Sequence, residues 1–127
     1  MISLIFWCLA AACCAVMDTL QHHFDSSVFF PSLKNSKRVY WWNPFLSWRN
    51  KYINQNPEKG LRKWLWFDVP FTDGWHTFKS LMIVFICISV ATFEPLIDSP
   101  IINIIIYGTA WNVIFNLFYN KILIKKK

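Results

Sequence analysis

The sequence predicts an all-α membrane protein with three transmembrane helices and a long basic, aromatic-rich interfacial connector between the first and second. Apolar spans lie at about 2–24, 76–97 and 101–123, close to the roughly 20 residues that a helix needs to cross a bilayer. The 127 residues are 55% hydrophobic and 19% aromatic, more than a small soluble domain usually contains. We therefore treat 1–127 as a single membrane domain, with the connector at about 25–75.

The first span is interpreted as a retained helix. It begins Met1-Ile2-Ser3-Leu4 without the positive charge of a signal peptide, and cysteines follow its alanine run where a cleavage site would need small residues. A cleaved signal peptide stays the alternative. The four cysteines are Cys8, Cys13, Cys14 and Cys87, all in apolar spans without metal-site spacing. We expect them to behave as small buried hydrophobic residues.

The connector combines helix breakers with positive charge. Four prolines and Gly60 exclude one long helix and favour short interfacial helices, one of them at about 47–52. Eight basic residues and one acidic residue lie between positions 34 and 63. Beside an anionic leaflet, each well-placed basic residue contributes about 1 kcal/mol. The predicted headgroup contacts are Lys34, Lys37, Arg38, Arg49, Lys51, Arg62 and Lys63. Nucleic acid is a less favoured partner than membrane lipids, because the charge lies between membrane spans.

The distribution of charge also predicts an orientation. Lys and Arg concentrate in the connector and towards the C-terminal tail, and basic loops stay in the cytoplasm. The N-terminus and a turn at 98–100 are then outside, while the connector and the C-terminus are cytoplasmic. This places the chain in the cytoplasmic (inner) membrane. Residues 94–100 are a short link, which predicts an antiparallel hairpin of the second and third spans.

Three runs of residues carry a resemblance. They are Met17-Asp18-Thr19-Leu20, Ser47-Trp48-Arg49-Asn50-Lys51-Tyr52 and Thr72-Asp73-Gly74-Trp75-His76. Together they resemble a group of uncharacterised small bacterial and phage multi-pass membrane proteins with no established activity. The resemblance implies a small integral membrane protein and nothing about its chemistry.

Two polar clusters form the best candidate for a chemical site. Asp18, His22 and Asp25 have i, i+4 and i+7 spacing, so they share one face if the first helix continues that far. Asp73 and His76 begin the second span at the same membrane level. The set Asp18, His22, Asp73 and His76 could hold a divalent transition metal, with Asp25 as candidate general base. The alternative is structural, with Asp73 capping the second helix and the histidines suiting the end of the first.

A second polar feature lies in the third span. Asn112, Asn116 and Asn120 recur every four residues and form a stripe along the helix. An amide facing hydrocarbon is costly, whereas an interhelical hydrogen bond contributes on the order of 1 kcal/mol. The stripe therefore predicts a helix–helix contact, which we favour over a transport path.

Several function classes are disfavoured. The three glycines form no phosphate-binding loop, a nucleophile elbow is absent, and three helices are few for a monomeric transporter. The sequence favours an accessory or structural subunit that assembles with itself or with a larger membrane complex. The alternative is a metal-dependent hydrolase or transferase acting on a lipid-linked substrate at the cytoplasmic interface.

Overall fold

Three long helices dominate the computed structural model, which describes residues 1–30, 36–62 and 69–125. They are α1 (Ile2–His22), α5 (Gly74–Ala91) and α6 (Pro100–Leu117), and α6 continues as a π-helix over Phe118–Leu123. By length and composition, α1, α5 and the whole of Pro100–Leu123 are apolar enough to cross a membrane. The prediction of three helical spans is confirmed to that extent.

The described part of the connector consists of short helices and turns. α2 (Ser36–Trp42) and α3 (Pro44–Ser47) are α-helical, and 3-10 helices cover Phe24–Ser26, Trp48–Lys51, Ile53–Gln55, Pro57–Lys59 and Val69–Phe71. In the described ranges the chain forms no strand, and its β-type pairing is limited to the bridges Ser27–Ile124 and Tyr52–Leu61. The helix expected at 47–52 is a 3-10 segment after α3.

The helix ends differ from the predicted spans. α1 ends at His22, so Asp25 lies in the following 3-10 helix and does not continue the helical face of Asp18 and His22. α5 ends at Ala91, several residues before the predicted end. Pro95 explains this early end, because a proline ring clashes with the carbonyl four residues back and disfavours helical geometry in the preceding residue.

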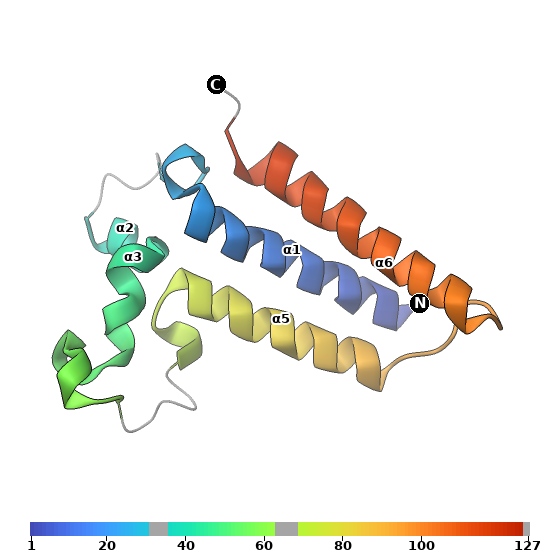
Figure 1. The fold of residues 1–127 in the computed structure, drawn as a ribbon, viewed down its shortest axis with the longest axis horizontal. Coiled ribbons are helices and arrows are strands. Elements are labelled where there is room, and N and C mark those ends of the chain that lie inside the picture. Colours follow the sequence, from blue (N-terminus) through green and yellow to red (C-terminus); the bar gives the residue numbers. More distant parts are fainter. Residues whose placement is uncertain (31–35, 63–68, 126–127) are drawn as a thin grey trace.

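The second and third spans run antiparallel, as predicted, but α5 and α6 do not pack closely on each other. α1 lies between α5 and α6 and packs on both, whereas α5 and α6 contact each other little (Figure 1). α1 runs antiparallel to α5 and parallel to α6. The N-terminus and the turn at 92–99 therefore lie at one end, the turn end. The connector and residue 125 lie at the other, the connector end (Figure 1).

α1 fits between the other two helices because most of the side chains that it buries are small. Ala10, Ala11 and Ala15 are completely buried, which lets the neighbouring backbones approach closely. α5 and α6 instead expose many large apolar side chains, such as Val90 at 68% and Ile104 at 72%. Large apolar side chains exposed in this way are suited to contact with lipid and not with water.

Polar side chains join the three helices near the turn end. Ser89 of α5 donates a hydrogen bond from Oγ to the carbonyl oxygen of Ser3, at 2.8 Å. The hydroxyl groups of Ser3 and Tyr107 are hydrogen-bonded to each other, and the Trp7 Nε1–H donates to the carbonyl oxygen of Tyr107 at 3.0 Å. These four side chains, Ser3, Trp7, Ser89 and Tyr107, form the helix clasp. It connects α1 to both flanking helices.

Asn103 holds the turn that leads into α6. Its Oδ1 accepts from the backbone N–H groups of Leu96 and Ile97, at 2.9 and 3.3 Å. Its Nδ2 donates to the carbonyl oxygens of Ile97 and Ser99, at 2.6 and 2.9 Å. One buried amide thus bonds to four backbone groups of the turn.

The main hydrophobic core lies at the connector end. Ala15, Val16, Leu20 and Phe24 are buried there together with Leu123 from the end of the third span. The Val28 N–H donates to the Leu123 carbonyl oxygen, and the Lys125 N–H donates to that of Ser26, both at 2.9 Å. The C-terminal strand-like segment is thereby paired with the chain just after α1.

The helix clasp gives the first testable prediction. Ser89→Ala removes the hydrogen bond between α5 and α1, and we expect a loss of about 1 kcal/mol in the free energy of unfolding. The control is Thr92→Ala, because the Thr92 hydroxyl bonds only to Ile88 of its own helix. Thermal unfolding in detergent, followed by circular dichroism, should show a lower Tm for Ser89→Ala than for Thr92→Ala. Equal Tm values would contradict an interhelical role.

Candidate polar site at the connector end

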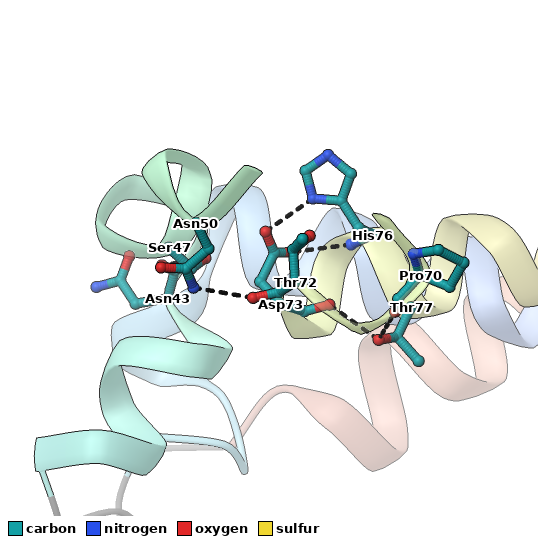
Figure 2. Close-up of polar contacts among 8 residues, drawn as sticks. All are labelled: Asn43, Ser47, Asn50, Pro70, Thr72, Asp73, His76 and Thr77. Atoms are coloured by element: carbon teal, nitrogen blue, oxygen red, sulfur yellow. Dashed lines mark hydrogen bonds and ion pairs between the residues drawn. The ribbon is translucent and has the colours of Figure 1, made fainter. Parts of the chain in front are cut away.

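Asp73 and His76 form a hydrogen-bonded pair at the first turn of α5. Asp73 Oδ1 accepts from the His76 backbone N–H at 2.8 Å, so Asp73 is the N-cap of the helix. Asp73 Oδ2 lies 2.7 Å from His76 Nδ1 (Figure 2). Asp73 is only 1% exposed, and both of its oxygens are occupied by this one residue. Asp73 therefore has the capping role that the sequence suggested as the alternative to metal binding.

The contact with Asp73 orients the imidazole ring of His76. An ionised carboxylate accepts hydrogen bonds and donates none, so His76 Nδ1 carries the proton in this contact. The other ring nitrogen, Nε2, points away from the Asp73 carboxylate (Figure 2). In the neutral ring Nε2 carries a lone pair, which can accept a proton or bind one metal ion. Asp73 thus orients the imidazole so that Nε2 is directed away from the carboxylate.

The connector docks directly beside this pair. Asn50 donates from Nδ2 to the Thr72 carbonyl oxygen at 2.8 Å, one residue before the cap (Figure 2). Thr77 donates to the Asp73 carbonyl oxygen at 2.9 Å and also contacts that of Pro70. The residues before α5 are therefore held from two sides, by the connector and by the helix itself.

The docked segment is shaped by its own cap. Asn43 precedes α3 and accepts the Phe45 N–H at 3.0 Å through its side chain. Buried Ser47 donates from Oγ to the Asn43 carbonyl oxygen at 2.9 Å. Asn43 and Ser47 thereby close the α3 turn, and the 3-10 segment that follows presents Asn50 to Thr72 (Figure 2).

Gly74 permits two tryptophans to approach the start of α5. A Cβ atom at Gly74 would lie 2.7 Å from a ring carbon of Trp42 and 3.1 Å from one of Trp41. Trp42 also stacks on Phe29, with ring centroids 4.5 Å apart, and lies 6.2 Å from Phe78. Any larger residue at position 74 would displace this aromatic group. The glycine is therefore a packing requirement.

The predicted metal ligands are not gathered around one point. In the ranges that the structure describes, no three His, Cys, Asp or Glu side chains lie close enough together to hold one metal ion. Asp73 and His76 are paired, but Asp18 and His22 do not join them in such a group. Both carboxylate oxygens of Asp73 are engaged by His76, and Asp18 and His22 belong to the last turns of a different helix, α1.

His22 and Asp25 lie in a different place, a cavity of about 440 Å³ between the end of α1 and the start of α3. Its wall consists of polar and aromatic side chains from both segments: Gln21, His22, His23, Phe24, Asp25, Ser26, Asn43 and Phe45. His22 and Asp25 are exposed, as is His23, whose ring meets that of Tyr119 edge to face at 5.5 Å. The two histidine-containing clusters thus face separate surroundings, and a general-base role for Asp25 stays a prediction.

The predicted headgroup residues are visible only in part. Lys34 and Lys63 lie outside the described residues, as do the side chains of Lys37 and Arg38. Arg49 lies 5.3 Å from the centre of the Trp48 ring, and Lys51 lies 5.3 Å from that of Tyr52. Arg62 is exposed. The sequence did not single out Lys79, which lies 4.8 Å from the Trp75 ring. Cation and aromatic ring repeatedly occur together on this end of the molecule.

In the described ranges, the Asn stripe forms its hydrogen bonds within its own helix. Asn112, Asn116 and Asn120 are exposed, and each Nδ2 group bonds to its own helix. Asn112 donates to the Gly108 carbonyl oxygen at 2.9 Å, Asn116 to that of Asn112 at 2.8 Å, and Asn120 to Asn116 Oδ1 at 3.1 Å. Contact between the helices of one chain comes instead from the helix clasp, which the stripe argument missed. Ser3 and Ser89 are polar residues within apolar spans, but the sequence does not show that they meet.

Gly74→Ala tests the docking of the connector. The added methyl group overlaps the Trp42 ring, and overpacking of this kind costs about 1–3 kcal/mol. We expect faster proteolysis of the connector and a shifted tryptophan emission, with helix content retained. Gly108→Ala is the matched control, because nothing lies within 4 Å of a Cβ at that helical position. Proteolysis at the wild-type rate in Gly74→Ala would refute the close approach.

Comparison with known proteins adds no assignment to this geometry. No protein-family model matches the chain, and no curated protein or solved structure does either. The resemblance to small bacterial and phage membrane proteins therefore stays an expectation from three sequence runs. Function has to be argued from the contacts and exposures of the chain's own residues.

Proposed function

We propose that this protein is a small multi-pass subunit of a membrane assembly, and that it makes its contact through the outer face of α6. The supporting observation is the exposed row Asn112, Asn116 and Asn120 within a candidate membrane span. The three amides turn away from α1, because Tyr107, Ile114 and Phe118 occupy the opposite side of the helix. A polar row on the outer surface of an otherwise apolar span is the feature that a partner helix would cover.

The three Asn side chains do not use all their hydrogen-bonding groups within α6 and the π-helix that follows it. A carboxamide has two N–H donors and an acceptor oxygen with two lone pairs. In the described part of the chain, each of the three amides uses one donor within its own helix, which leaves further donors and acceptors at the surface. Hydrocarbon offers them no partner, whereas an adjacent helix with polar groups does.

The connector supplies the second part of the proposal. Arg49, Lys51 and Lys79 pair with aromatic rings at one end of the bundle, a combination that suits the headgroup region of a membrane. We assign that end to the cytoplasmic side of the inner membrane, and the turn end to the outside. The basic side chains then contact anionic headgroups.

The alternative, a metal-dependent hydrolase or transferase, has less support. Among the described residues, no group of three or more His, Cys, Asp or Glu side chains could hold a metal ion. The Asp73–His76 pair has a simpler purpose in this proposal. It caps α5 and fixes the site where the connector docks, which keeps the basic residues at one level of the membrane.

Orientation is tested by labelling. A cysteine replacing exposed Glu58, in a background without the four native cysteines, should react with a membrane-impermeant maleimide only from the cytoplasmic side. A cysteine replacing exposed Asp98 in the turn should react only from outside. The purified wild-type protein should also retain anionic phospholipid, detected by native mass spectrometry. Labelling of both positions from the same side would refute the arrangement of the two ends.

Assembly is tested by removing the amides. Asn112→Leu with Asn116→Leu should leave insertion and helix content unchanged, because both changes make the span more apolar. We expect the complex to weaken by about 1 kcal/mol for each interhelical bond lost. The measurement is native electrophoresis of membranes solubilised in mild detergent. Wild-type protein at the size of a lone chain, or a variant that migrates with the wild-type assembly, would refute the proposal.

A further inference from the structure

We infer that the partner covering the Asn row is a second copy of this chain, bound through parallel α6 helices related by a two-fold axis along the membrane normal. This inference rests on the proposed function and names its partner. It is carried by the composition, spacing and openness of one helix face.

The row that would form the contact is regular and narrow. Gly108, Asn112 and Asn116 follow one another at four-residue intervals, about 6 Å apart along the axis of α6, and Asn120 continues the row in the π-helical segment. All four are exposed, and a Cβ at Gly108 would meet nothing within 4 Å. Gly108 leaves room for a neighbouring backbone at one end of the row, and Asn side chains hydrogen-bond between helices in membranes. The face is therefore shaped for another helix.

The chemistry of the row matches a copy of itself. A row of carboxylates or ammonium groups would repel its own copy, but a carboxamide both donates and accepts. When the same side chain lies on both sides of a two-fold axis, the Nδ2 of one Asn can donate to the Oδ1 of the other, and the reciprocal bond forms at the same time. An isologous interface requires such self-complementarity.

The membrane fixes the relative direction of the two helices. Copies inserted by the same charge distribution share one orientation, so two α6 helices meet parallel. In a parallel pair with two-fold symmetry, position 112 faces position 112 and position 116 faces position 116. An antiparallel pair would instead match 112 with positions further along the partner helix. The inference therefore specifies which positions meet.

Disulfide formation in native membranes tests this pairing. In the cysteine-free background, Asn112→Cys and Asn116→Cys should each form a covalent dimer with a mild oxidant, at least about five times as much as the control. The control is Leu117→Cys, which is next to Asn116 and also exposed, but lies about 100° around the helix. Co-expressed 112 and 116 variants should give mainly the two like pairs. Dimer yields equal to the control, or predominance of the mixed pair, would overturn the inference.

A second measurement protects the test against a poorly folded variant. Wild-type protein carrying one fluorophore per chain should show two-step photobleaching in isolated detergent-solubilised particles, whereas Asn112→Leu with Asn116→Leu should shift towards one step. Single-step bleaching of wild-type protein that still migrates as a large complex would overturn the second copy as partner and leave the proposed function standing. Single-step bleaching together with migration as a lone chain would overturn both.

Discussion

The packing of α1 between α5 and α6 is the constraint on which the rest of the structure depends. The flanking helices hardly touch, so each relies on α1 for its position in the bundle. Completely buried alanines let α1 fit between them, and the helix clasp supplies hydrogen bonds to both sides near the turn end. The same arrangement leaves the outer surfaces of α5 and α6 exposed. A helix face such as the Asn row is available to a partner only because no helix of this chain covers it.

At the connector end, contacts of the residues around the α5 N-cap hold the connector against that helix. Asp73 caps α5, and its carboxylate also orients His76, which fixes the first turn of the helix. Gly74 beside it is open enough for Trp41 and Trp42 to lie against the helix. Asn50 then attaches the connector through a backbone group. Three successive positions of the chain, 72 to 74, thus serve the cap, the aromatic packing and the docking.

Hydropathy was enough to locate the three long helices, because their apolar composition is a property of each segment alone. It was not enough to find their neighbours. The short link between α5 and α6 predicted their antiparallel order, but the position of α1 between them depends on the fit of Ala10, Ala11 and Ala15 against two surfaces at once. Pro95 shortened α5, which proline chemistry could have shown.

The polar residues were harder to assign. Their spacing along a helix gives the face they occupy but not what that face meets. Asp73 was recognised as a cap or ligand, and the cap is what the contacts display. Asp18 and His22 share α1, but their spacing along that helix could not show whether they would join Asp73 and His76 of α5. Asn103 and Ser89 went unnoticed for the same reason, since their partners are backbone groups of other segments.

The central position of α1 bears on the order in which the chain reaches its fold. α1 is made first, and the two helices that enclose it are joined to each other by the turn at 92–99, which passes the N-terminal end of α1 (Figure 1). α5 and α6 therefore pack on two sides of a helix that precedes them in the chain. A chain that began after α1 would present two helices whose inner faces have lost their common support.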